Sequence, residues 1–255
     1  MACLGRRSVA ADAEDAPRVE PRHDAPPPPG WPEDVAFLTR PRLGPAFPPA
    51  LIPLLLPQPT AQSPTSSPLS LSSSLSSSAS SSTLLSASST RFAPRATPHP
   101  AIVAIKRVTT PSHPAYGQRC LVARRRIAQG EMVIPYLGII HADVVSEGEE
   151  EKSNKDPAHA ESDYDLSLLR LSASDIRNPL PGHVSIGVDA AQAGNAARFV
   201  NDYRGVASKP NAEFRVGRGE AGELRMEVWA LKGGIAKGDE VLVSYGKGWW
   251  GARRQ

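Results

Sequence analysis

Short runs of β-branched and aromatic residues follow one another along the second half of the chain. Segments 101–108, 119–125 and 131–140 are rich in such residues and are bounded by Pro or Gly, which predicts three strands. Apolar and polar residues alternate over 225–231, the pattern of a half-buried strand, and 240–246 has the pattern of a more buried one. Short strands separated by turns predict a mainly β fold.

Two further segments have weak helical patterns. Residues 164–172 and 190–200 are each predicted to form a helix of fewer than three turns. The strands and helices together predict one α+β domain, mainly β with short helices, over residues 99–255. About 155 residues suffice for a full hydrophobic core.

The first hundred residues differ in composition from the rest. Nineteen of the 26 prolines lie in residues 1–100, and serine occupies 16 of the 27 positions 63–89. Such a segment buries too little apolar surface to offset the entropy cost of ordering it. Residues 1–98 are therefore predicted to form a disordered tail, whose removal should leave the stability of the folded part unchanged.

Charge leaves several interpretations open. The formal net charge of +3 is compatible with an acidic partner without requiring one. The basic run 123–128 is either a solvated strand end or a nucleic-acid contact, and no interleaved aromatic residues offer base stacking, so direct nucleic-acid binding is not expected. The acid-rich segment 146–163 is either a solvated loop or a rim that steers a basic peptide.

Several classes of site lack a sequence signal. Cys3 and Cys120, the only cysteines, argue against a disulfide framework and a cysteine zinc site, and no metal is expected. The N-terminus has no signal-peptide core, and the apolar run 50–57 is too short and proline-broken to span a membrane. We expect a monomer in the nucleus or cytoplasm that is not secreted.

Four segments together resemble the SET domain family of S-adenosylmethionine-dependent protein lysine methyltransferases. In chain order they read "GQRCLVARRRIAQGEMVIPYLGII", "SIGVDAAQAGNAARFVND", "PNAEF" and "IAKGDEVLVSYG". The likeness covers about residues 100–250 and is greatest to fungal or plant-like members, without the pre-SET and post-SET cysteine clusters. It implies a SET-type fold of several small sheets with a C-terminal pseudoknot, with a core over about 100–246 and an aromatic tail over 247–255.

The resemblance also implies an activity and a set of site residues. The activity is N-methylation of a lysine in a histone or another basic protein, with S-adenosylmethionine as cofactor. Tyr245 matches the catalytic tyrosine, and Asn201 would bind the amino-acid part of the cofactor with Phe199 packed beneath it. The implied cofactor residues are Arg119, Cys120, Arg198, Phe199, Asn201, Asp202 and Tyr245. The implied channel residues are Tyr136, Tyr164, Val243 and Trp249.

Two departures from the family pattern leave a second function open. Asp202 stands where histidine is usual, and residues 118–120 stand where Gly-x-Gly is usual, with Gly117 one residue early. Cys120 is readable as a small buried apolar residue, and the tyrosines and C-terminal tryptophans as core packing. These departures favour a catalytically inactive SET-like module that binds a peptide or protein, whereas Arg198, Asn201 and Tyr245 favour an active methyltransferase.

Overall fold

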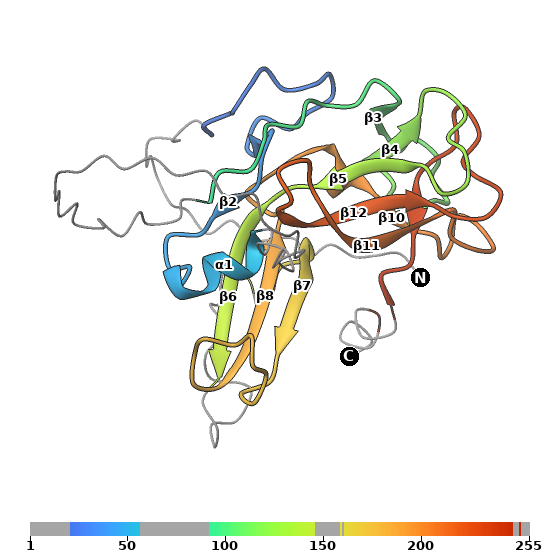
Figure 1. Ribbon diagram of the computed structural model, residues 1–255. Helices are drawn as coiled ribbons and strands as arrows, with labels where there is room; N and C mark the ends of the chain where they lie inside the picture. The colour runs from blue at the N-terminus through green and yellow to red at the C-terminus, as the bar shows by residue number, and fades with distance from the viewer. Residues whose placement is uncertain (1–20, 57–91, 146–158, 160, 247–249, 251–255) are drawn as a thin grey trace, which may run out of the picture.

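The computed structural model describes residues 21–56, 92–145, 159, 161–246 and 250. Within this part of the chain the strands form five small sheets, two of which contain more than two strands (Figure 1). The one α-helix whose residues are all described is the single turn α1 (Ile52–Leu55). The prediction of a mainly β fold with short helices and several small sheets is confirmed.

The two larger sheets share a boundary at the turn between β5 and β6. The three-stranded sheet has the antiparallel order β11 (Ala212–Arg218), β12 (Leu224–Ala230) and β5 (Met132–Tyr136). The four-stranded sheet has the order β2 (Arg42–Leu43), β6 (Ile139–Val145), β8 (His183–Asp189) and β7 (Asp165–Leu171). In Figure 1 the strands β6, β8 and β7 extend away from the β5–β12–β11 sheet.

Three two-stranded pairings complete the described fold. The hairpin strands β3 (Val103–Arg107) and β4 (Arg119–Ala123) are antiparallel. The strands β1 (Ala36–Phe37) and β9 (Ala193–Gly194) are parallel, as are β10 (Asn201–Asp202) and β13 (Leu242–Val243). Two 3-10 turns, η1 (Pro49–Leu51) and η2 (Ala196–Phe199), precede α1 and β10 respectively.

One hydrophobic cluster joins both larger sheets and the β3–β4 hairpin. Its fully buried members include Leu121 of β4, Ile134 of β5, Ile186 of β8 and Val228 of β12. The turn η2 packs into the same cluster through Ala196, Ala197 and Phe199. The core therefore lies directly beneath the segment 194–203, which carries four of the predicted site residues: Arg198, Phe199, Asn201 and Asp202.

The strand predicted over 131–140 is two strands. β5 ends at Tyr136 and β6 begins at Ile139, in a different sheet. A Cβ atom on Gly138 would lie 2.4 Å from the carbonyl oxygen of Asp189, so only glycine lets the chain pass this close to β8. The glycine thus marks the change of sheet inside an apolar run that reads as continuous.

Both predicted helices are wrong as regular helices. Residues 165–171 form the strand β7, whose pairing with β8 is shifted between Ser167 and Leu169. This irregularity leaves Leu168 and Leu171 as the buried residues, and a spacing of three imitates a helical face. Within 190–200 the chain forms β9 and the short turn η2.

Part of the chain before residue 98 packs against the predicted domain. Residues 21–56, which we call the N-terminal segment, pair in parallel through β1 with β9 and through β2 with β6. The backbone N–H of Thr97 donates to the carbonyl of Thr39, so residues 92–98 return along the same segment. The rest of the predicted tail, residues 1–20 and 57–91, lies outside the described residues, as does 146–158 of the acidic segment.

A few large apolar side chains anchor the proline-rich N-terminal segment. Leu38, Leu51 and Leu55 are fully buried, and Leu51 and Leu55 belong to the main core cluster. Proline fixes its backbone and lacks an N–H group, and an extended strap that pairs only briefly with the sheets tolerates both properties. None of the described helices is long and apolar enough to cross a membrane.

Candidate functional site

The start of β4, the strand β10 and the C-terminal strand β13 meet at one place in the molecule. In the parallel β10–β13 pair Asn201 lies opposite Leu242 and Asp202 opposite Val243. The Asn211 side chain extends this contact, since its Nδ2 donates to the carbonyl of Glu240 and its Oδ1 accepts from the N–H of Leu242. The C-terminal strand is thus held beside β10 over its whole length, as a SET-type crossing of these segments requires.

The turn before β10 is held by a buried asparagine. Asn195 donates from Nδ2 to the carbonyl of Pro135 at 2.8 Å. Its Oδ1 accepts from the N–H groups of Leu137 and Ala197, so the side chain caps η2 and fastens it to the β5–β6 turn. Phe199 then enters the core, and the chain leaves the apolar layer at residue 201. The polar run after Phe199 therefore lies where the chain reaches the edge of the core.

Asn201 belongs to a polar network that links three parts of the chain. Its Nδ2 donates to Glu240 Oε1 at 2.7 Å and to the carbonyl of Arg119 at 3.4 Å. The other carboxylate oxygen of Glu240 lies 3.0 Å from His113 Nε2. Glu240 and His113 were not predicted as site residues, and their separation of 127 positions in the chain explains why the sequence pattern did not bring them together.

Asp202, at the usual histidine position, is a buried carboxylate that fastens the C-terminal residues. Its Oδ2 accepts from the N–H of Tyr245 at 2.7 Å, from an Arg204 guanidinium nitrogen at 2.9 Å and from Trp250 Nε1 at 3.3 Å. The Arg204 guanidinium also lies over the Trp250 ring, 5.6 Å from its centroid. Trp250 thus covers the β10–β13 pair, and Trp249 lies outside the described residues.

Tyr245 and Tyr136 both have their hydroxyl groups fixed by backbone carbonyls. The Tyr245 hydroxyl donates to Val200 at 2.7 Å, and the Tyr136 hydroxyl donates to Tyr164 at 2.7 Å. Burial raises the pKa of Tyr136 well above its ordinary value, Arg198 acts in the opposite direction, and the nearby Tyr245 and Tyr164 add to the increase. Tyr136 therefore stays a neutral phenol at physiological pH.

Arg198 fixes the position of Tyr164 rather than extending into solvent. Its guanidinium carbon lies 4.2 Å from the centroid of the Tyr164 ring, a cation–π contact. The same group donates from Nε to the carbonyl of Ala190 at 2.8 Å and from Nη2 to that of Ala191 at 3.1 Å. The structure therefore brings Arg198, Tyr164 and Tyr136 into one contiguous group.

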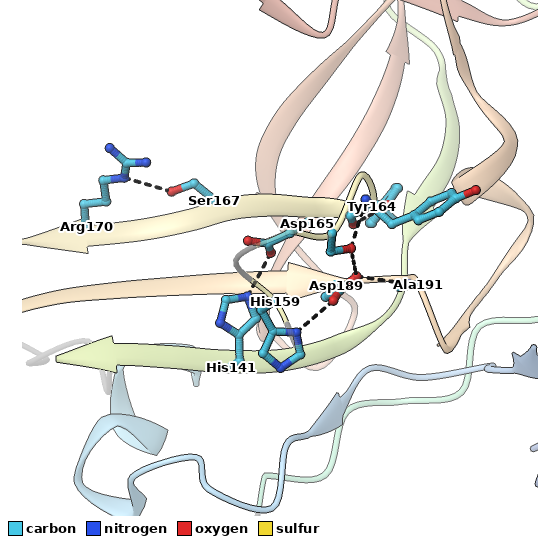
Figure 2. A network of polar contacts seen from close by, with 10 residues as sticks. His141, His159, Tyr164, Asp165, Ser167, Arg170, Asp189 and Ala191 are labelled. Atoms are coloured by element: carbon cyan, nitrogen blue, oxygen red, sulfur yellow. Dashed lines mark hydrogen bonds and ion pairs between the residues drawn. The ribbon is translucent and has the colours of Figure 1, made fainter. Parts of the chain in front are cut away.

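A histidine and aspartate network lies behind Tyr164. Figure 2 shows His141 and His159 face to face, with ring centroids 4.1 Å apart. His141 Nε2 is 2.8 Å from Asp165, and His159 Nδ1 is 2.7 Å from Asp189. Asp189 also accepts from the Ser162 hydroxyl, which in turn accepts from the N–H of Tyr164. The network thus fixes the backbone that leads into Tyr164.

Parallel stacked rings do not point their nitrogens at a common centre. Accordingly, among the described residues no group of three or more His, Cys, Asp or Glu side chains is placed to hold a metal ion. His141 Nδ1 is buried and has no hydrogen-bond partner among them. Burial opposes protonation of His141, but the hydrogen bond and charge of Asp165, with Asp143 and Asp189 nearby, raise its pKa above the ordinary value.

The start of β4 contacts the N-terminal segment. Arg119 donates from Nε to the carbonyl of Gly30 at 2.7 Å. Trp31 packs edge-on against Phe199, with ring centroids 5.5 Å apart, and against Phe37 at 5.1 Å. Two predicted cofactor residues are therefore braced by residues that lie outside the SET-like segments.

Cys120 is a buried, unreactive thiol. It packs with Val108, Ala115 and Val122, and burial, with the charge of Glu240, raises its pKa to about 11. Gly117, immediately before the predicted cofactor loop, has φ +78° and open space where a Cβ would be. Val243 is fully buried in the core cluster opposite Asp202.

Comparisons with known proteins found one matching family and several similar structures. Residues 118–246 match the family model of the SET domain. A crystal structure of an active polycomb repressive complex 2 in the basal state is 27% identical, with a TM-score of 0.37, and the match covers 57% of this chain and 15% of that chain. The crystal structure of the Chaetomium thermophilum complex is also 27% identical, with a TM-score of 0.35 and the same two shares.

A third structure, of this complex in an autoinhibited conformation bound to S-adenosylmethionine, is 25% identical, with a TM-score of 0.34 and coverage of 56% and 15%. The matched part of the chain spans only about 15% of the length of each of these three relatives. None of the curated proteins matches the chain.

Proposed function

Since the chain belongs to the SET domain family, we propose that it is a protein-lysine N-methyltransferase that uses S-adenosylmethionine. The observation that carries the proposal is the convergence of Asn201, Tyr245 and the start of β4 through the β10–β13 pair. These segments are distant in the chain, and they are the ones in which the family motifs occur.

The polar groups at this place fit the cofactor. Asn201 uses its Nδ2 within the protein, and no donor among the described residues reaches its Oδ1, which is therefore free to accept a ligand N–H. Phe199 supplies an apolar floor, and the backbone at Arg119 and Cys120 forms one wall. Asp202, with its carboxylate committed to the C-terminal residues, would contribute only backbone groups.

When bound, S-adenosylmethionine supplies an electrophilic methyl group on a sulfonium. The Tyr245 hydroxyl donates to the carbonyl of Val200 at 2.7 Å, and in the proposed reaction its oxygen would accept a weak C–H···O contact from the methyl group. Tyr164, which stacks on Arg198, and Tyr136, whose hydroxyl donates to the Tyr164 carbonyl, would line an approach for the substrate side chain.

The substrate lysine must lose a proton before it can accept a methyl group. The ordinary pKa of a lysine amine is about 10.4, and an apolar environment favours its neutral form. The buried, neutral phenol of Tyr136 would contribute apolar surface to that environment. The protein would thus contribute alignment and desolvation, with a lysine-containing basic protein such as a histone as the substrate class.

The structural roles of two substituted residues favour a second function, that of an inactive peptide-binding module. Asp202, in place of the usual histidine, serves as a structural anchor, and Cys120, in place of a glycine, is packed in an apolar cluster. Both residues can be explained by stability alone. A measurement of cofactor binding separates the two functions.

The test uses calorimetric titration of the full chain with S-adenosylmethionine, followed by a peptide-array methylation assay. Asn201→Ala should weaken cofactor binding by about ten- to a hundredfold, because it removes the side chain that presents a free acceptor. Tyr245→Phe should reduce turnover far more than cofactor affinity. Absence of binding to the wild-type chain at millimolar cofactor, with loss of thermal stability in both variants, would leave only the inactive module.

A further inference from the structure

Glu240 is a carboxylate without a cationic side chain beside it. Its side chain is only 14% exposed and lies just before β13, bridged through its backbone to Val122 of β4. Among the described residues no lysine or arginine comes within ion-pair distance of it, and His113 is the only ionisable group that does. A buried charge is costly unless an opposite charge or several hydrogen bonds compensate it.

The hydrogen bonds of His113 are those of a neutral imidazole ring. The N–H of Ala115 donates to His113 Nδ1 at 2.9 Å, so this nitrogen acts as an acceptor and carries no proton. The proton is then on Nε2, which donates to Glu240 at 3.0 Å. A doubly protonated ring would direct a second N–H at the N–H of Ala115. His113 therefore orients Glu240 without neutralising it.

The second donor to Glu240 is also neutral. Asn201 Nδ2 reaches the carboxylate at 2.7 Å and leaves its own Oδ1 without a protein donor among the described residues. The negative charge of Glu240 also acts on Cys120 of β4: burial raises the pKa of this thiol, Glu240 raises it further, and Lys106 acts in the opposite direction. The site thus contains a carboxylate with two neutral donors and no cationic partner, next to an amide whose oxygen accepts from no described protein donor.

We propose that Glu240, oriented by His113, receives the α-ammonium group of S-adenosylmethionine beside Asn201. The inference rests on the proposed function. An ammonium group has three N–H donors and one positive charge, which match a carboxylate and an amide oxygen. The sulfonium carries the same charge but has no N–H donor, so it fits this pair of acceptors less well.

The test compares three ligands on the full chain with Glu240→Gln, which keeps the size of the side chain and removes its charge. S-adenosylmethionine and S-adenosylhomocysteine both carry the α-ammonium group, and only the first carries the sulfonium. Both should bind the variant about ten- to a hundredfold more weakly than they bind the wild type, by the same factor. 5′-Methylthioadenosine lacks the amino-acid part and should keep its affinity.

The neighbouring exposed carboxylate offers a matched control. Asp239→Asn removes one negative charge one residue away and should leave all three affinities unchanged. If Glu240→Gln does not fold, Glu240→Asp keeps the charge and shortens the side chain. It should then weaken the two ammonium ligands equally, without affecting 5′-methylthioadenosine.

Each alternative result overturns the inference in a distinct way. Unchanged affinities in Glu240→Gln would make the carboxylate purely structural. Weaker binding of S-adenosylmethionine alone would assign the charge to the sulfonium, and weaker binding of all three ligands would mean a general change in the shape of the site. A wild-type chain that binds no S-adenosylmethionine overturns the proposed function itself, a result that none of the other outcomes produces.

Discussion

The N-terminal segment pairs with the rest of the molecule through two strands of two residues each, whereas β6 and β8 in the matched segment pair over seven residues. Yet Leu51 and Leu55 are as completely buried as Leu121 of β4. Long paired strands supply the burial in one region, and leucines in two short helical turns supply it in the other. Full burial in one core therefore does not require a long element.

The two regions also meet at the candidate site. The matched segment contributes Phe199 and Arg119, and the N-terminal segment contacts them through the Trp31 ring and the Gly30 carbonyl. Trp31 is itself fixed, because its Nε1 donates to the carbonyl of Val35 at 2.7 Å. The segment that matches the SET family thus depends on residues outside it for the support of its site.

The largest expected loss of stability comes from deleting residues 1–56, which removes the N-terminal segment. Burying a leucine contributes roughly 1.5–3 kcal/mol, and whole domains are stable by only about 5–15 kcal/mol. Loss of Leu38, Leu51 and Leu55 together should therefore abolish cooperative unfolding or lower the melting temperature by many degrees. Thermal melting followed by circular dichroism measures this.

The matched control is deletion of residues 1–20 alone, which should melt like the full chain, as the composition predicts. A melting temperature that is unchanged after removal of residues 1–56 would show that the N-terminal segment adds no net stability. The expectation of a dispensable tail would then hold for residues 1–56.

Single leucines in the two regions sharpen the comparison. Leu51→Ala and Leu121→Ala should each lower the free energy of unfolding by about 2–5 kcal/mol, because both side chains are fully buried in the same cluster. Val216, which is 50% exposed, is the control. Val216→Ala should change the free energy of unfolding by no more than about 0.5 kcal/mol. Urea unfolding measures all three. A Leu51→Ala effect as small as that of Val216→Ala would place the N-terminal segment outside the cooperative core.

The matched segment was the more predictable of the two regions. Strands such as β4 and β12 follow from local apolar patterns, and the "ARFVND" and "SYG" segments from their family resemblance. β7 was missed because an irregular pairing changes the spacing of its buried leucines. β1 was missed because two residues pair with a strand more than 150 positions away, and no local pattern records such a contact.

The candidate site divides in the same way. Asn201 and Tyr245 stand in motifs of the family, and the sequence predicts both as site residues. Glu240 and His113 can be recognised as site residues only from their contact in the structure, which joins positions 127 residues apart. A glutamate before a strand and a histidine in a loop are each ordinary in isolation.

The smallest predicted effect is a pH dependence that also separates the two regions. The pKa of His141 in the matched segment is raised: burial opposes protonation, but Asp165 outweighs it, with Asp143 and Asp189 adding to the increase. His159, stacked on the ring, is the other ionisable group facing it. A raised pKa contributes stability that is complete below the unfolded value of about 6.5 and is lost as the pH rises through the folded value.

In the N-terminal segment, the contribution of Asp24 to stability depends on pH only at acidic pH. Burial opposes ionisation of Asp24, but its bonds to Arg42 and to the N–H of Thr39 lower its pKa. A lowered pKa contributes stability that is present above the unfolded value of about 3.9 and is lost as the pH falls through the folded value. The contribution of Asp24 is therefore constant between pH 6 and 8.5, the window in which His141 should respond.

The measurement is the free energy of unfolding of the wild type and of His141→Gln across pH 6 to 8.5. The difference between them should be largest at pH 6 and should shrink as the pH rises, because only the wild type loses a bound proton that stabilises the fold. Asp165→Asn removes the main group that raises the pKa and should show the same weakened dependence. Asp24→Asn should run parallel to the wild type over this window, since the Asp24 carboxyl is ionised throughout it. A constant difference between the wild type and His141→Gln would mean that His141 is not held in its charged form by Asp165.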